Sequence, residues 1–309
     1  MYSLSVSYLS AFSHVAVLFL LIFAGYASRR LGILDSALTR GLSRLIVNLT
    51  LPALVIGSLQ IGFSRNRAAD LLAMVGISAA CYGFYFFCAW LLPNLLRAKE
   101  KDRGVYRFLA VFSNTGFMGY PMLESFLGPE ALFYGVAFNL PYNLLQFTVG
   151  VSFLSSPGRT GRGFPWKNPG ILATALGLFL FLLPWRLPAL VSTPLNILGG
   201  MTTPLAMLVI GSLLADLEGT GAWKDPKLYA AVAVRLLVIP GAVCAGLAAA
   251  GFGGFLRGVP VLLSAMPAAA NISILAAEYG GEEELASRLV FVTTLLSGLT
   301  LPLFAGILG

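Results

Sequence analysis

Charged residues are scarce in this chain of 309 residues. Only 11% are Asp, Glu, Lys or Arg, whereas a soluble globular protein carries about 25%. Apolar residues make up 58% and the mean hydropathy is +0.85. Most of the chain must therefore face something other than water, which excludes a soluble enzyme, a disordered regulator and a nucleic-acid binder. The net charge of +7 is better explained by basic loops that contact an anionic membrane surface.

Residues that perform chemistry in enzymes are also few. The three cysteines, Cys81, Cys88 and Cys244, lie in apolar stretches without metal-ligand spacing, and their odd number gives no disulfide framework. An intramembrane hydrolase or transferase would need a metal cluster, a Ser–His pair or paired acids. One histidine, with no HExxH and no aspartate-rich motif, leaves little for such chemistry. We therefore expect neither catalysis nor a metal or other cofactor.

Long apolar runs fill most of the sequence. A helix that spans a membrane needs about 20 mostly apolar residues. Arg29 and Arg30 follow the first run, whereas a cleaved signal peptide has its positive charge before the apolar core. We predict an all-α membrane protein with ten transmembrane helices, over residues 5–28, 36–60, 69–93, 104–127, 130–154, 169–185, 191–216, 227–250, 255–279 and 284–308.

Basic residues are unevenly divided between the two sides that these helices define. One side carries Arg29, Arg30, Arg97, Lys99, Lys101, Arg103, Arg107, Arg159, Arg162, Lys167, Lys224 and Lys227. The other side carries only Arg65, Arg67, Arg186 and Arg257. The side richer in Lys and Arg faces the cytoplasm. This distribution predicts a multi-pass protein of the inner (plasma) membrane with both termini outside the cytoplasm.

The two halves of the chain resemble each other. The sequence Val-Ile-Gly-Ser-Leu occurs at 55–59 and again at 209–213, an offset of 154 residues. Because five helices is an odd number, two five-helix halves must cross the membrane in opposite senses. The sequence therefore predicts two inverted repeats, residues 1–155 and 156–309, which together form one transporter unit. The basic stretch Ser155–Lys167 is the expected join.

The fourth predicted helix contains the run Phe112-Ser-Asn-Thr-Gly-Phe-Met-Gly-Tyr-Pro121. Proline lacks an N–H, and its ring clashes with the carbonyl group four residues back. Gly116 and Gly119 weaken the same turn. We expect this helix to break near its middle and to leave backbone groups unpaired beside Asn114 and Thr115. In a membrane, protein or a water-filled cavity must satisfy such groups.

The ninth predicted helix repeats this device in the run Ser264-Ala-Met-Pro267-Ala-Ala-Ala-Asn271-Ile-Ser273. Two broken helices that cross near the midplane would present the positive ends of half-helices to an anion. The candidate substrate ligands are Asn114, Thr115, Asn271 and Ser273, with backbone near Gly116, Pro121 and Pro267. Neither break contains an Asp, which disfavours a carboxylate-centred sodium/proton antiporter.

Two other interpretations of these motifs stay open. Pro and Gly are common in membrane helices and can merely kink them, although a matched pair, one in each half, favours a site. Asn114 and Asn271 could instead form hydrogen bonds between helices, which are worth about 0.6 kcal/mol on average. Arg235, about two turns into the eighth helix, could hold a substrate carboxylate, pair with an acid or reach towards the cytoplasmic face.

Several motifs resemble those of the auxin efflux carrier family. They are Asn114-Thr-Gly-Phe-Met-Gly-Tyr-Pro121 with Gly128-Pro-Glu, Lys167-Asn-Pro169, Pro204-Leu-Ala-Met-Leu-Val-Ile-Gly-Ser-Leu213, Arg235-Leu-Leu-Val-Ile-Pro240, Met266-Pro, Glu278-Tyr-Gly and Leu301-Pro302. The matches extend over the whole chain. The short join between the halves is similar to that of prokaryotic members.

The resemblance implies a ten-helix transporter, usually a homodimer, with a scaffold part and a moving transport part. Helices four and nine of that family cross at proline-broken points beside the substrate, where Asn114 and Pro121 match. In helix nine, Pro267 matches an early proline, but Ile272 stands where plant carriers have another. Bacterial relatives are associated with malate, malonate and similar acids.

We therefore predict a secondary transporter of small mono- or dicarboxylates, working by elevator or rocking movement in the lipid bilayer. Coupling to protons or sodium is left open. The alternatives are a sodium-coupled symporter of the bile-acid type, a membrane sensor without transport, and a channel of the same fold.

Overall fold

A computed structural model describes residues 8–60, 65–155, 169–183, 187–216 and 225–308. These residues are helical, with turns and bends between the helices, and they contain no β-strand. Residues 156–168, which make up most of the predicted join, lie outside this part of the chain. The predicted all-α class is therefore confirmed for the described residues.

The first half of the chain forms nine α-helices and three short π-helical segments, the latter labelled η. They are α1 (Tyr8–Arg30), α2 (Ser36–Leu45), η1 (Ile46–Thr50), α3 (Leu51–Ser58), α4 (Arg65–Leu95), α5 (Glu100–Val111), η2 (Thr115–Gly119), α6 (Tyr120–Leu127), α7 (Ala131–Phe138), α8 (Leu140–Leu145), η3 (Gln146–Gly150) and α9 (Val151–Leu154).

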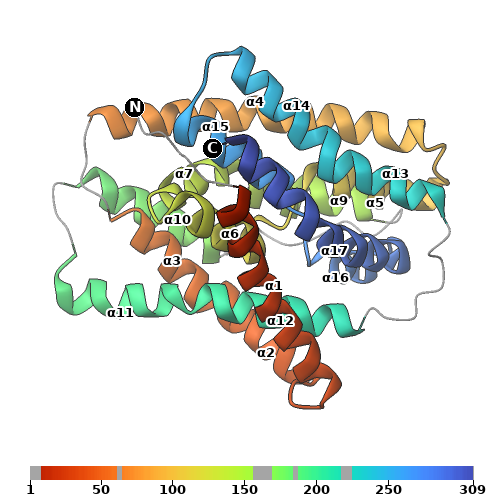
Figure 1. Ribbon diagram of the computed structural model, residues 1–309, viewed down its shortest axis with the longest axis horizontal. Helices are drawn as coiled ribbons and strands as arrows, with labels where there is room; N and C mark the ends of the chain where they lie inside the picture. Colours follow the sequence, from red (N-terminus) through yellow and green to blue (C-terminus); the bar gives the residue numbers. More distant parts are fainter. Residues whose placement is uncertain (1–7, 61–64, 156–168, 184–186, 217–224, 309) are drawn as a thin grey trace.

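The second half follows a similar pattern of long and interrupted helices. They are α10 (Pro169–Leu182), α11 (Ala189–Gly200), α12 (Thr202–Asp216), α13 (Pro226–Ala233), η5 (Val234–Val238), α14 (Ile239–Ala249), α15 (Gly254–Ala265), α16 (Ile272–Tyr279) and α17 (Glu283–Leu308). In Figure 1, α4 lies along one edge of the molecule and α11 with α12 along the other, with α5, α6 and α7 between them.

Within the described part of the chain, five stretches of helix are long and apolar enough to cross a membrane. They are Ser36–Ser58, Arg67–Leu95, Ala189–Ala215, Pro226–Ala249 and Glu283–Leu308. Two shorter helices, Pro169–Leu182 and Gly254–Ala265, are also apolar. Many large hydrophobic side chains on these helices point outward, among them Leu72, Trp90 and Leu299. Outward-facing apolar side chains are expected where the surrounding solvent is hydrocarbon.

Helices α1 and α12 pack against each other with backbone in direct contact. A Cβ atom at Gly25 would collide with the carbonyl of Leu208, and one at Gly211 with the carbonyl of Ile22. Small residues let membrane helices approach closely, because packing rather than water exclusion drives their association. Gly211 lies in the second copy of the repeated Val-Ile-Gly-Ser-Leu motif.

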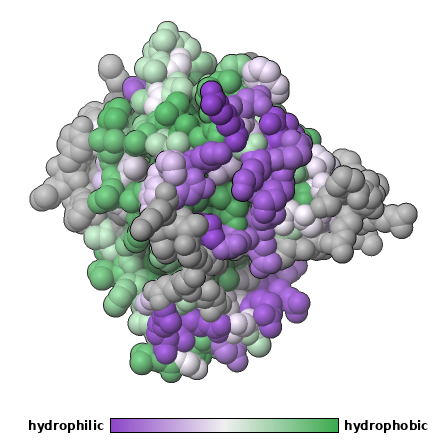
Figure 2. Space-filling view, turned by 90° about the vertical axis from the view of Figure 1, so that its right-hand side faces the viewer, coloured by the Kyte–Doolittle hydropathy of each residue, from purple (hydrophilic) through white to green (hydrophobic). Residues whose placement is uncertain are grey.

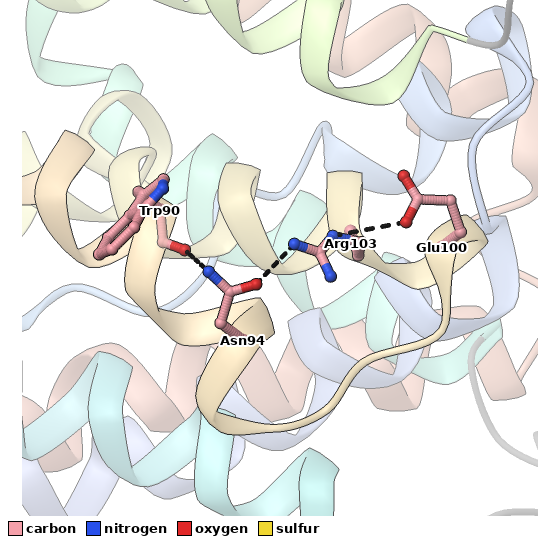
Figure 3. A network of polar contacts seen from close by, with 4 residues as sticks. All are labelled: Trp90, Asn94, Glu100 and Arg103. Carbon is pink, nitrogen blue, oxygen red and sulfur yellow. Dashed lines mark hydrogen bonds and ion pairs between the residues drawn. The ribbon is translucent and has the colours of Figure 1, made fainter.

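Polar residues gather at the end of the molecule that lies on the right in Figure 1, as Figure 2 shows. The α4–α5 turn is held there by Asn94, which accepts from Nη2 of Arg103 at 2.6 Å and donates to the Trp90 carbonyl at 3.0 Å (Figure 3). Lys101 pairs with Glu282 at 2.9 Å, and this contact raises the pKa of the lysine. Exposed pairs of this kind contribute little stability.

Candidate functional site

The first interruption lies between α5 and η2. Helix α5 ends at Val111, and Phe112 is extended, with φ −106° and ψ 110°. Asn114 then caps the next helix, because its side-chain oxygen accepts from the N–H of Phe117 at 3.3 Å. The chain therefore breaks well before Pro121.

The helix does break near its middle, beside Asn114, but Pro121 is not the cause. Pro121 lies inside a helix that continues through it, because the turn before it takes up the distortion that a proline imposes. The preceding turn is widened to a π-helix, in which the N–H of Tyr120 reaches the carbonyl of Thr115. Residues 115–127 are thus continuous as helix.

The second interruption lies between α15 and α16. Helix α15 ends at Ala265, and Met266 is extended, with ψ 148°. Proline disfavours the helical conformation in the residue before it, so Pro267 explains why the helix stops here. The helix resumes at Ile272, after Asn271. Here the proline does mark the break.

The two interruptions cross and pair through their backbones. The N–H of Asn114 donates to the carbonyl of Pro267 at 2.9 Å, and the N–H of Ala269 donates to the carbonyl of Phe112 at 3.3 Å. Ser113 and Ala268 thereby form an isolated antiparallel bridge. This pairing satisfies backbone groups that would otherwise be unpaired inside the membrane.

Arg235 lies behind this crossing, with only 1% of its surface exposed. Its guanidinium donates to the carbonyl of Met266 from Nε at 3.2 Å and from Nη2 at 3.0 Å, and to the carbonyl of Ala110 from Nη1 at 3.4 Å. Both carbonyl groups lie at the C-terminal ends of half-helices, where acceptors are orphaned and the helix dipole is negative. Arg235 therefore joins α5 to α15 through their backbones.

A chain of polar side chains continues from the crossing into η3. The Tyr142 hydroxyl donates to the carbonyl of Ser113 at 2.8 Å and accepts from the Gln146 amide at 2.8 Å. The Gln146 amide nitrogen also donates to the side-chain oxygen of Asn271 at 3.3 Å. Residues from the fifth predicted helix thus fix the orientation of the Asn271 side chain.

A cavity of about 110 Å³ opens beside the crossing. Residues 114–117 and 269–271 form one wall, so the cavity lies at the N-terminal ends of the two resumed helices. Such ends carry partial positive charge and favour an anion. The remaining lining residues come from η1, α3, α6, α8, η3, α10 and the α7–α8 turn: Val47, Leu51, Val55, Tyr120, Asn139, Tyr142, Gln146, Gly170 and Thr174. Among the residues that the structure describes, none that lines the cavity is charged.

Four of the predicted ligands meet in this cavity: Asn114, Thr115, Gly116 and Asn271. The others do not line it. Pro121 is buried in α6, Ser273 lies in the first turn of α16, and Arg235 contacts backbone. Pro267 takes part through its carbonyl, which pairs the two interruptions.

The fifth and sixth predicted helices contribute to the cavity, which was not predicted from the sequence. Asn139, Tyr142 and Gln146 line the cavity from the fifth and Thr174 from the sixth, and all four are buried. A signal was present, because three amide side chains within one apolar segment, at 139, 143 and 146, are costly and mark functional sites in membranes. Asn139 also stands two residues before Pro141, at the turn between α7 and α8.

Comparisons with known proteins place this chain in a family. A family model described as membrane transport protein matches residues 10–162 and 165–305. The chain is 25% identical over 305 residues to an uncharacterized transporter of Methanocaldococcus jannaschii, covering 95% of this chain and 97% of that protein. It is 26% identical over 292 residues to a Rhizobium meliloti protein named "Putative malonate transporter", covering 90% and 89%. The chain therefore belongs to the membrane transport protein family, which is the auxin efflux carrier family that its motifs resemble.

Proposed function

We propose that this protein is a secondary transporter of small organic anions, and that the cavity at the crossing is its substrate site. The observation that carries the proposal is the position of the cavity at the N-terminal ends of two resumed helices, one from each half of the chain. Asn114, Thr115 and Asn271 supply neutral polar groups beside those ends. A carboxylate is favoured there by the helix dipoles without a basic ligand.

The size of the cavity supports a small substrate. A cavity of about 110 Å³ has room for several water-sized groups, each of which needs at least about 10–15 Å³. This size suits a small carboxylic acid, whereas a steroid of the bile-acid type is much larger. The printed name of the Rhizobium meliloti relative points to the same class of substrate.

The walls of the cavity support alternating access. Part of the lining belongs to the crossing, and another part comes from η1, α3 and α10. Movement of the crossing bundle against α3 and α10 would expose the cavity first on one side of the membrane and then on the other. The proposed mechanism assumes ten membrane spans in two inverted repeats. We propose in addition that both termini lie outside the cytoplasm and that the protein is a homodimer.

The test is transport by the purified protein in proteoliposomes. Asn114→Ala should reduce malonate uptake about tenfold or more, because it removes both a lining amide and the cap of η2. Asn48→Ala is the matched control, since Asn48 is exposed and bonds only to the carbonyl of Arg44. Unchanged uptake kinetics in a folded Asn114→Ala variant would refute the assignment of the site.

Counterflow separates a carrier from the alternatives. A carrier exchanges labelled malonate faster when the opposite side is loaded with substrate, and its flux saturates. A channel shows neither behaviour, and a sensor without transport shows no flux. Dependence of uptake on sodium would favour a sodium-coupled symporter.

A further inference from the structure

Asn139 presents an unusual side chain to the cavity. It is only 4% exposed, and it stands at the turn between α7 and α8, across from the crossing. Within the described part of the chain, neither its amide nitrogen nor its amide oxygen makes a hydrogen bond of normal geometry, although the Tyr120 hydroxyl lies close enough to interact. Leaving a buried polar group unpaired is costly.

The other amides around the cavity already have partners. Asn114 caps η2, and Gln146 and Asn271 bond to each other. Asn139 therefore differs from them, because it keeps both a donor and an acceptor available in a cavity lined by uncharged groups.

We propose that Asn139 recognises a protonated carboxyl group, so that the site takes a small dicarboxylic acid in its singly ionised form. This inference rests on the proposed function. A carboxyl group offers one O–H donor and one carbonyl acceptor, which match the oxygen and the NH₂ group of an amide. A carboxylate has acceptors only, and it would leave the Asn139 oxygen unpaired.

The charge around the cavity also favours a singly ionised substrate. The helix ends of the crossing favour one negative charge, and the buried cation nearby, Arg235, is bonded to backbone on the far side of the crossing. No cation among the described residues lines the cavity. A second carboxylate in this site would be desolvated without a counter-charge, which is costly. The substrate would then carry one proton with it across the membrane.

The groups that could titrate around Asn139 are few. Tyr120 and Tyr142 line the cavity, Tyr134 of α7 donates to Asp70 of α4 at 2.8 Å, and Glu124 of α6 is exposed. Among the residues that the structure describes, no acid, lysine or histidine lines the cavity, so the pH dependence should follow the ionisation of the substrate rather than of the protein.

Malonate and malonamate test this proposal in counterflow at equal pH on both sides of proteoliposomes. Above the second pKa of malonate, the KM for total malonate should rise about tenfold for each pH unit, because the singly ionised fraction falls tenfold. Malonamate has a permanently neutral amide in place of the second carboxyl group. Its inhibition constant should therefore stay constant over the same range, and a malonate KM independent of pH would overturn the proposal.

Asn139→Leu provides a second, independent measurement. It should raise the inhibition constant of malonamate tenfold or more and leave that of propionate within twofold, because propionate has no second polar group for residue 139 to bind. An equal effect on both inhibitors would indicate a merely structural role and would overturn the proposal. If neither malonate nor propionate is exchanged by the wild-type protein, the proposed function fails as well, whereas exchange with a constant malonate KM overturns this inference alone.

Discussion

The guanidinium of Arg235 donates two hydrogen bonds to the main-chain carbonyl of Met266, and a third to that of Ala110. These carbonyl groups end two half-helices that run into the crossing from different halves of the chain. A buried cation is costly unless its donors are satisfied. Here the acceptors are backbone groups that would otherwise be orphaned, so the cation and the two helix ends stabilise each other.

Replacement of Arg235 should therefore destabilise the crossing. Arg235→Met leaves two buried carbonyl groups without this donor, and we expect it to lower the free energy of unfolding by about 2–5 kcal/mol. Arg235→Lys should recover part of the loss, because one ammonium group can reach one carbonyl but cannot bridge both. Thermal unfolding in detergent should therefore rank the stabilities as wild type, then Arg235→Lys, then Arg235→Met.

Arg257→Met is the control for Arg235, since Arg257 is half-buried and bonds to the Cys244 sulfur. Its effect should be smaller than that of Arg235→Met. If Arg235→Lys were as stable as the wild type but inactive in transport, Arg235 would act on the substrate and not on the two carbonyl groups.

The sequence could locate Arg235 in a membrane helix but could not identify its partners. Met266 and Ala110 have no polar side chain, and their carbonyl groups become free acceptors only because the helices end beside them. Pro267 did predict one of these ends, since proline constrains the residue before it. The end of α5 beside Ala110 depends on the hydrogen bond between Asn114 and the Pro267 carbonyl. That bond is a tertiary contact, so the local sequence gives no sign of it.

The candidate site could likewise be predicted only in part from the sequence. Asn114 and Asn271 stand in motifs with local helix breakers, and both line the cavity. Asn139 and Gln146 reach the cavity only because the fifth predicted helix folds back against the crossing. Their amides mark this helix as unusual in a membrane, but the sequence alone does not tell a ligand from a hydrogen bond between helices.

The contact between α1 and α12 predicts that Gly211 does not tolerate a side chain. A Cβ at this position would strike backbone atoms of Ile22 and Tyr26, which cannot move without separating the two helices. Gly211→Ala should lower the free energy of unfolding by about 1–3 kcal/mol. Gly76→Ala in α4 is the control: its Cβ meets no atom within 4 Å, so it should be neutral or stabilising. Equal unfolding temperatures for the two variants would contradict this packing.

Thr293 of α17 should stabilise the second interruption. Its hydroxyl accepts from the N–H of Ala268 at 3.1 Å, in the middle of the paired segment. Thr293→Val keeps the shape but leaves that buried N–H unpaired, at a cost of about 1–3 kcal/mol. Thr294→Val is the control, because Thr294 is equally buried on the same helix and makes no contact with the Ala268 N–H. The prediction is wrong if both variants unfold at the same temperature.

The last prediction concerns Arg97, in the turn between α4 and α5. It has a φ of 45°, and among the described residues no other side-chain-bearing residue has a positive φ. The N–H of Ala98 bonds to the carbonyl of Pro93 and that of Arg97 to Asn94, the pattern in which helices usually end on glycine. A left-handed conformation costs about 1–2 kcal/mol for a residue with a Cβ.

Arg97→Gly should therefore raise the free energy of unfolding by about 1 kcal/mol. Arg97→Ala separates backbone from charge, since it removes the same guanidinium but keeps the Cβ. Both variants retain the carbonyl that accepts from Nζ of Lys227 at 2.9 Å, so the difference between them measures the backbone strain alone. Chemical denaturation in detergent should give a higher free energy of unfolding for Arg97→Gly than for Arg97→Ala. If the two variants were equally stable, the turn would not be strained at this residue.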